Sequence, residues 1–395
     1  MLGMGQVGSK NDTNKEGTLQ CAVRKKGLYP YLLVPSQQQQ QQQCDNDENN
    51  DENNTNTNNN NTNTNTNTNN NNSPWATSSN VRNVRIMSSK IYKNEFLTIH
   101  DNDTIGPEVG IGHYLEQKRG APPCSDDGNG NGNGNGNGND ATATTATITA
   151  TATTAKATTK KKIMLLKSCI GNRSLGWDLL PPGSQRYNYK GETFAGYKDS
   201  PAKWDQNQPK PDPPPPDDKN SWYAGKEYDT DIADAKSILA DLNRYYPDSS
   251  SSTNHHQTYK VVGFFWWQGD KDRYEEAYSV RYELNLVRLI QQLRNDFDCP
   301  DAKFVLATLG QTEIRNNNNN NNNKDNSNDR RIFEAMMAVD GNSGKYPNFV
   351  GNVATVYAHP LSKGGASNSH YNGNAETYMN VGEAMGKAMA ELVPN

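Results

Sequence analysis

The sequence predicts an α/β domain with a mainly parallel, doubly wound sheet of flavodoxin-like kind. Three observations lead to this fold class: short apolar runs, amphipathic helical patterns between them, and a length that suits one domain. When low-complexity tracts are set aside, roughly 250 to 280 of the 395 residues remain, which is within the usual range for a single α/β domain.

Four apolar runs predict the strands. Each run is short for a helix and largely continuous, which is typical of strands that are covered on both faces. The runs are residues 81–87, 163–170, 259–267 and 303–309.

Helical patterns lie between these runs. Residues 274–297 give the clearest one, because Leu286, Ile290 and Leu293 fall on a single apolar stripe at helical spacing. Shorter helices are predicted at residues 107–117, 232–245, 331–339 and 375–392. The alternation of strands and helices is what indicates a doubly wound sheet.

Low-complexity tracts interrupt this domain. Hydrophobic residues make up only 32% of the chain and its mean hydropathy is -0.99, because long stretches are rich in Gln, Asn, Thr, Gly or Pro. Such stretches bury too little apolar surface to offset the entropy of ordering them. We therefore expect one domain over residues 1–395, interrupted by disordered insertions at about 36–74, 125–160, 208–220, 248–257 and 316–328.

Composition also excludes several kinds of partner and site. The formal net charge of -4 argues against nucleic acid as a partner. Five cysteines without a CxxC pair predict neither a zinc site nor a disulfide framework, and no apolar run approaches the roughly 18 residues of a membrane span. No metal or organic cofactor is expected, whereas oligomeric state and cellular location stay open.

Polar, glycine-containing segments follow three of the predicted strands, at residues 171–177, 268–273 and 310–313. The carboxyl ends of parallel strands meet at one edge of a sheet, and sites in doubly wound folds form at that edge. The sequence therefore places the chemistry where these three segments meet.

The segment from Gln268 to Asp272 carries an amide, a glycine and two carboxylates directly after an apolar strand. A Gln at a strand end can direct its N–H donors into a cleft, where they stabilise the oxyanion of an acyl-transfer intermediate. The same residues also fit an ordinary strand exit with Asp270 or Asp272 as a helix N-cap. Both interpretations stay open on these residues alone.

Two further segments are candidates for the same site. Gly171, Asn172 and Arg173 form a turn after a strand, which exposes backbone N–H groups; a tight surface turn explains them equally well. His370 lies in a polar loop just before the last predicted helix. A histidine there can act as a general base, although a loop histidine is more often a plain surface residue.

Residues 266–272 resemble a family signature. They match the Trp-x-Gln-Gly-Glu-x-Asp motif of the sialate O-acetylesterase and acetylxylan-esterase group of the SGNH hydrolases, with Asp270 in place of Glu. The resemblance implies a three-layer SGNH-hydrolase fold and an oxyanion-hole role for Gln268. Residues 168–177 are similar to the family's Gly-Gly-Thr-Ser block, which implies a second oxyanion donor at Gly171 or Asn172. His370 then takes the position of the general base.

The catalytic triad implied by the resemblance departs from the family pattern twice. Ser367 stands three residues before His370, where SGNH enzymes usually carry Asp, so Asp270 or Asp272 is the candidate for orienting the imidazole. The nucleophilic serine is absent. The opening Met1-Leu2-Gly3-Met4-Gly5 continues the family's Gly-Gln-Ser-Asn-Met block from its methionine onward, which puts the serine two residues before Met1.

The strand that carries this serine is the first in the family's fold and central in its sheet, so the fold is expected to lack it here. Either translation has been assigned to start at an internal methionine, or the protein has lost its activity. Ser9, Ser174 and Ser184 do not replace the missing serine, because none has the turn that exposes and fixes a nucleophile.

The resemblance implies a carboxylic ester hydrolase that removes O-acetyl groups from carbohydrate by two-step acyl transfer. Arg173 and Trp177 are candidate substrate-binding residues, and Tyr187, Trp204 and Trp222 can stack on sugar rings or belong to the core. Sialate, xylan and other acetylated polysaccharides all stay open as substrates. The alternative is a non-catalytic carbohydrate-binding remnant of the same fold.

Overall fold

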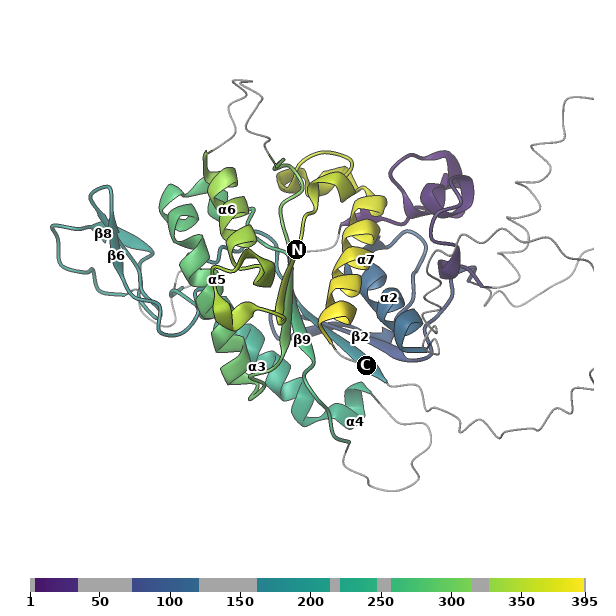
Figure 1. Cartoon of the computed structure of the whole chain (residues 1–395), viewed down its shortest axis with the longest axis horizontal. Helices are drawn as coiled ribbons and strands as arrows, with labels where there is room; N and C mark the ends of the chain where they lie inside the picture. The colour runs from purple at the N-terminus through teal and green to yellow at the C-terminus, as the bar shows by residue number, and fades with distance from the viewer. Residues whose placement is uncertain are drawn as a thin grey trace, which may run out of the picture.

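A computed structural model describes residues 4–34, 73–120, 162–213, 221–246, 257–314 and 327–393. Helices cover two three-stranded sheets, so the predicted α/β class is confirmed (Figure 1). The predicted insertions lie mostly outside the described residues, which include only their ends at 73–74, 208–213, 257 and 327–328.

The secondary structure of the described residues follows the order of the chain. The strands are β1 (Gly5–Gln6), β2 (Val81–Met87), β3 (Lys90–Phe96), β4 (Thr104–Ile105), β5 (Ile163–Ser168), β6 (Tyr187–Tyr189), β7 (Glu192–Phe194), β8 (Lys203–Asp205), β9 (Gly263–Trp266), β10 (Lys303–Ala307) and β11 (Val353–Val356). The α-helices are α2 (Glu108–Gly120), α3 (Lys226–Ala240), α4 (Leu242–Tyr245), α5 (Glu276–Asp296), α6 (Ser327–Ala338) and α7 (Ala375–Leu392). Short helical turns are η1 (Asp12–Asn14), the π-helix η2 (Cys21–Lys25), η3 (Pro30–Leu32), η4 (Asp272–Tyr274), η5 (Gly341–Ser343), η6 (Pro347–Phe349), η7 (His359–Leu361) and η8 (Ser367–Gly373).

Every predicted strand and helix is present, and the differences lie at the ends. The apolar run at 259–267 is strand only at Gly263–Trp266, and the helix predicted at 232–245 begins earlier and is interrupted at Asp241, between α3 and α4. The other strands were not predicted. β3 is mostly polar and β11 has four residues, so neither shows a usable apolar period.

The two main sheets are built mostly from parallel strands. One has the order β11-β10-β9, all parallel, with Phe304 of β10 between Phe264 and Val353. The other has the order β3-β2-β5, in which β2 and β5 are parallel and β3 is antiparallel. A small antiparallel meander, β6-β7-β8, projects beside α5 (Figure 1).

The single sheet expected from the sequence is therefore divided. Within the described residues β5 pairs only with β2 and β9 pairs only with β10, so the inner edges of the two sheets share no ladder.

Helices lie on both faces of the two sheets. α2 and α7 cover one face, where Val305 of β10, Phe265 of β9 and Leu165 of β5 pack on the same cluster. α5 and α6 cover the other face of β9 and β10, and α3 and α4 cover the matching face of β2 and β5. The α7 helix begins where the Asn374 side chain accepts a hydrogen bond from the Thr377 N–H at 3.0 Å.

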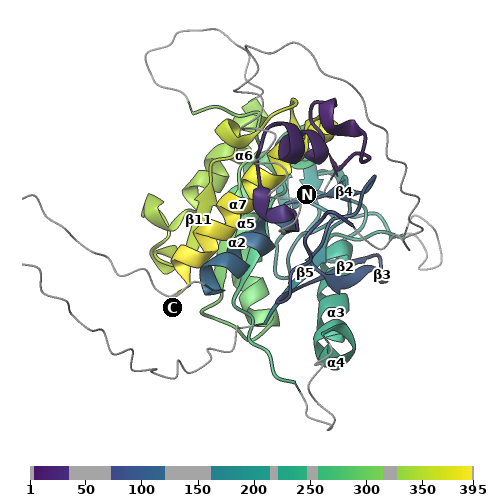
Figure 2. The ribbon, with the colours of Figure 1, turned by 90° about the vertical axis from the view of Figure 1, so that its right-hand side faces the viewer.

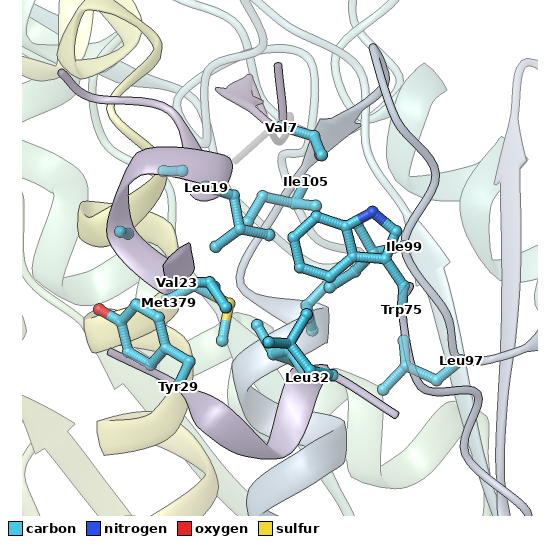
Figure 3. Packing of buried hydrophobic residues seen from close by; sticks show 14 of the residues in the cluster. Val7, Leu19, Val23, Tyr29, Leu32, Trp75, Leu97, Ile99, Ile105 and Met379 are labelled. Atoms are coloured by element: carbon cyan, nitrogen blue, oxygen red, sulfur yellow. The ribbon is translucent and has the colours of Figure 1, made fainter. Parts of the chain in front are cut away.

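Residues 4–34 are an integral part of the core. Val7, Leu19, Val23 and Leu32 are fully buried and pack with Met379 of α7 (Figure 3). Figure 2 shows this segment, in purple, beside α7. The packing holds the start of the described chain against the helix that follows His370. Among the described residues, no helix is long and apolar enough to cross a membrane.

Candidate active site

Three hydrogen bonds bring the predicted site segments together at the carboxyl ends of β5, β9 and β10. The Gln268 Nε2 donates to the Arg173 carbonyl at 2.9 Å, which ties the β9 end to the β5 end. The Ser367 hydroxyl donates to Asp270 Oδ1 at 2.7 Å, which ties the His370 loop to the same turn. The Gly310 N–H donates to the Tyr371 hydroxyl at 3.2 Å. Segments that are far apart in the sequence thus meet at one edge, as the strand-end rule predicts.

The Gln268 side chain is fully engaged within the protein. Its Nε2 donates to the Arg173 carbonyl and, at 2.6 Å, to Asp272 Oδ2, and its Oε1 accepts from the Tyr282 hydroxyl at 2.9 Å. Gly269 follows with φ of 139°, a conformation that favours glycine. In this arrangement Gln268 holds two turns together. The predicted oxyanion role would require one of its two donated bonds to open, and it stays a prediction.

Asp272 is a fully buried carboxylate that fixes the turn after β5. It accepts hydrogen bonds from the Leu175 N–H at 2.9 Å, the Gly176 N–H at 2.7 Å and Gln268 Nε2. Burial raises its pKa to about 6, against the opposing effect of these bonds. None of these partners belongs to the His370 loop. The geometry therefore gives Asp272 a positioning role and leaves Asp270 as the candidate for orienting the histidine.

The turn at Gly171 and Asn172 presents two backbone N–H groups. Within the described chain neither amide donates a hydrogen bond, although the next residue, Arg173, is held by Gln268. Asn172 is exposed and has φ of 62°, in the left-handed region that Asn tolerates better than most residues. This backbone conformation sets the path of the turn. Free amides at a strand end are suitable donors to an oxyanion.

Asn172 offers a test of how much the turn depends on its backbone. Replacing it by Val should lower the free energy of unfolding by about 1–2 kcal/mol, because a β-branched residue is strained at this φ. Replacing it by Gly should change stability by less than about 0.5 kcal/mol. Urea denaturation of the two variants beside the parent measures both effects. Equal losses in the two variants would mean that the Asn side chain, rather than the backbone, matters.

The two residues predicted to bind substrate lie in different surroundings. The Arg173 guanidinium stacks on Trp222, with its carbon 4.8 Å from the ring centre, and its Nε lies 3.4 Å from Glu227. Trp177 instead packs against a buried cluster around Leu180 and Trp204. The arrangement keeps Arg173 and Trp222 as candidates at the site and places Trp177 as a packing residue.

The remaining aromatic candidates are also accounted for by packing. Tyr187 stacks on Phe194 with ring centres 5.2 Å apart, and Trp204 is buried. Both belong to the β6-β7-β8 meander. Their interpretation as core residues, left open by the sequence, is the one that the geometry favours.

The His370 loop has an unusual backbone. His370, Tyr371 and Asn372 all have φ near 50°, and three successive non-glycine residues in the left-handed region must be held by their surroundings. Tyr371 supplies this hold, because it is fully buried and stacks on Trp267 with ring centres 5.6 Å apart. The Tyr378 hydroxyl also donates to the His370 carbonyl at 3.3 Å.

His370 itself is half-buried, and its Nδ1 is buried without a hydrogen-bond partner. In a Ser-His-Asp arrangement this nitrogen donates to a carboxylate, which holds the imidazole in the tautomer that leaves Nε2 free to act as a base. Asp270 is linked to the loop through Ser367 and also lies 3.0 Å from Arg273 Nε. The Asp270 carboxylate therefore contacts the loop that carries the candidate base, through the Ser367 hydroxyl.

Sequence reasoning missed an acidic group behind Arg173. Asp231 of α3 accepts a hydrogen bond from Ser168 at the end of β5, and burial raises the pKa of Asp231 to about 7. Burial also raises the pKa of Glu227, one turn earlier on the same helix. The spacing of these two carboxylates was visible in the sequence, but nothing there indicated that α3 packs against the end of β5.

The alternative serines are engaged elsewhere. The Ser174 hydroxyl donates to Asp178 at 3.0 Å and the Ser184 hydroxyl donates to the Pro181 carbonyl, while the Ser9 N–H is bound by Asp12. No histidine is a partner of these three residues within the described chain. Nor does that part of the chain contain a group of three or more His, Cys, Asp or Glu residues that could hold a metal ion.

Comparison with known proteins gives a match to one family model and to one solved structure. Residues 237–391 match the family model described as carbohydrate esterase, sialic acid-specific acetylesterase, a range that includes Gln268, Asp270 and His370. A search of curated proteins finds no match. A crystal structure of a protein from Arabidopsis thaliana aligns with 12% identity and a TM-score of 0.38, over 80% of this chain and 82% of that chain. The segment 237–391 is thus similar to the carbohydrate esterase, sialic acid-specific acetylesterase family.

Proposed function

We propose that the complete protein is a serine esterase that removes O-acetyl groups from carbohydrate, with a nucleophile that lies upstream of Met1. One observation carries the proposal: the start of the described chain lies against the His370 loop. A Cβ placed on Gly373 would lie 3.2 Å from the Met4 carbonyl oxygen, and one placed on Gly5 would lie 2.8 Å from the Tyr378 ring. The start of the described chain therefore lies beside the loop and the helix that flank the candidate base.

The proposed reaction has two steps. His370 takes the proton of the serine hydroxyl while the serine oxygen bonds to the acetyl carbon, and the amides of Gly171 and Asn172 stabilise the oxyanion. The carbon–oxygen bond to the sugar breaks, and the sugar oxygen takes the proton from His370. Water then attacks the acetyl-serine with His370 again as the base, which releases acetate and restores the serine.

Asp270 is proposed to orient His370. The support is the Ser367 hydroxyl, which donates to Asp270 at 2.7 Å, together with the unpaired, buried Nδ1 of His370. Ser367 occupies the position at which SGNH enzymes usually carry Asp. The carboxylate is then supplied from the turn after β9 instead of from the loop that carries the histidine.

The function is tested with two forms of the protein, one from Met1 and one extended by the residues encoded directly upstream. We expect hydrolysis of an O-acetylated sialic acid, with an acetylated xylo-oligosaccharide as the second substrate, only in the extended form. Replacing His370 by Ala in that form should lower kcat at least about 10³-fold. Binding of deacetylated sugar by both forms without turnover in either would contradict the proposal and indicate a carbohydrate-binding remnant.

The orienting role of Asp270 predicts a specific pattern of variants in the extended enzyme. Asp270→Asn should lower kcat about 10²-fold or more. Ser367→Asp alone should also impair turnover, because it would place a second carboxylate beside Asp270. The double variant Asp270→Ser, Ser367→Asp restores one carboxylate and should recover at least about tenfold of the loss. If the losses in kcat of the two single variants simply multiplied in the double variant, a carboxylate at position 367 could not replace the one at position 270.

A further inference from the structure

A histidine is buried where residues 4–34 meet the two helices α2 and α7. His113 of α2 is 6% exposed, and its ring packs against the ring of Tyr31 in η3, with centres 5.3 Å apart. The Tyr31 hydroxyl in turn donates a hydrogen bond to Glu383 of α7. The Nε2 of His113 is buried and has no hydrogen-bond partner within the described chain. Three elements thus meet around an imidazole nitrogen that is shielded from solvent.

The charged groups around His113 are bound to other partners. Glu116, three residues further along α2, accepts a hydrogen bond from the Asn80 side chain at 3.0 Å. Glu383 is engaged by Tyr31, so neither carboxylate is available to a protonated imidazole without rearrangement. On the side of the β3-β2-β5 sheet, α2 meets apolar side chains, which include Val81, Leu97 and Leu165.

Protonation of His113 is unfavourable while Tyr31 covers its ring. Burial lowers the pKa of His113 to about 4 from the ordinary 6.5, and the Glu116 charge opposes this only in part. Once water reaches the ring, the pKa returns toward 6.5. The closed contact is therefore fully stable above pH 6.5 and loses stability as pH falls toward 4. Glu383 opposes this loss, because burial raises its pKa.

The two helices leave little room for a charged ring to adjust between them. A Cβ placed on Gly110 of α2 would lie 2.6 Å from the Met379 carbonyl oxygen of α7, so the backbones are already in close contact. Tyr31 is only half-buried and belongs to a short helical turn. Movement of Tyr31 is therefore the least costly way to bring water to the imidazole.

We propose that the contact between His113 and Tyr31 is a pH-sensitive switch, which releases the segment around η3 from α2 and α7 when His113 is protonated. The switch goes beyond the proposed function and uses none of the candidate catalytic residues. Its effect extends to the candidate site, because Lys26 of the same segment pairs with Glu376 at 2.7 Å, directly after the His370 loop.

The switch is tested by hydrogen exchange at pH 7 and pH 5, with rates corrected for the intrinsic effect of pH. We expect protection of residues 19–34 to fall about five- to 20-fold at pH 5, the lower figure allowing for Glu383. Protection of residues 366–374 should fall by a smaller factor. Protection of β10 should not change, because this strand lies between two others.

Substitutions of His113 separate the switch from a general effect of acid. His113→Phe keeps an aromatic ring against Tyr31 but cannot take a proton, so protection of residues 19–34 should be equal at both pH values. His113→Gln should also lack the pH response, and it serves if Phe does not fit. His100→Gln is the matched control: His100 is exposed and pairs with Glu95, so this variant should respond as the parent does.

Three outcomes would overturn the inference. The first is unchanged protection of residues 19–34 between pH 7 and pH 5 in the parent. The second is an equal fall in the parent and in His113→Phe or His113→Gln, which would assign the response to another group. The third is a parallel loss of protection in β10, which would mean that acid destabilises the whole domain instead of releasing one segment.

Discussion

The Asp272→Asn variant is expected to unfold with a free energy about 2–3 kcal/mol lower than the parent at pH 7. Asp272 is fully buried and accepts from the N–H groups of Leu175 and Gly176 and from Gln268. An Asn side chain keeps one acceptor oxygen but turns an NH2 group toward these donors. The turn that presents Gly171 and Asn172 should loosen with it. Urea denaturation followed by tryptophan fluorescence measures the loss.

The raised pKa of Asp272 predicts how the loss of stability in Asp272→Asn depends on pH. Burial raises the folded pKa to about 6 from an ordinary value of 3.8, so between these values the folded state holds a proton that the unfolded state releases. Stability from this group is therefore greatest at acid pH and falls as pH rises toward 6. The deficit of Asp272→Asn should be larger at pH 4 than at pH 7, by up to about 3 kcal/mol.

An exposed aspartate supplies the control. Asp298 is exposed in the left-handed region, which Asn tolerates, so Asp298→Asn should change stability by less than about 0.5 kcal/mol at either pH. If the deficit of Asp272→Asn shrank toward acid pH, the donated bonds would outweigh burial and the folded pKa would lie below 3.8.

Glu376→Gln is expected to lower the free energy of unfolding by about 2 kcal/mol at pH 7. The Glu376 side chain is 2% exposed and receives hydrogen bonds from Lys26 at 2.7 Å and from Lys363. These ion pairs join the N-terminal segment and the loop before His370 to the first turn of α7. Gln keeps an acceptor but loses the charge, and both lysines must then rehydrate.

The pH dependence of Glu376 runs in the opposite direction to that of Asp272. Burial by itself would raise its pKa, but the bonds from Lys26 and Lys363 outweigh burial and hold the pKa below the ordinary 4.5. A lowered folded pKa gives stability that is present above pH 4.5 and is lost as pH falls through the folded value. The deficit of Glu376→Gln should therefore be full at pH 7 and fade toward pH 4.

Glu391→Gln is the matched control on the same helix. Glu391 is exposed and lies 4.0 Å from Lys387, a surface pair that contributes little. Its substitution should cost less than about 0.5 kcal/mol at either pH. Thermal unfolding of the two Gln variants side by side is sufficient, and equal shifts would show that the buried pairs of Glu376 add nothing.

Helices and strands were predictable where apolar residues recur at regular spacing, or run together, over a long enough stretch of sequence. α5, α7 and β10 were predicted to within a few residues, because a buried face imposes its spacing on the sequence. β3 and β11 were not, since a mostly polar edge strand and a four-residue strand leave no such spacing. The convergence of residues 171–177, 268–273 and 310–313 was also predictable, from the rule that parallel strands end at one edge.

The roles within the site were less predictable. The sequence offered Asp270 and Asp272 as equal candidates for orienting His370, and only the packing separated them. Asp272 points to the amides of Leu175 and Gly176, whereas Asp270 reaches the His370 loop through Ser367. The two residues lie close together after β9 but face different directions, and a spacing of two in the sequence does not say which partner each one meets.

The sequence by itself determined the α/β class, the order of the main elements and the residue types at the site, because local periodicity and strand ends are written along the chain. Only the tertiary structure decided that Gln268 has both donors engaged, that Asp231 backs the end of β5, and that the sheet is divided between β5 and β9. These features depend on contacts between segments distant in the sequence, which packing, burial and backbone pairing select together.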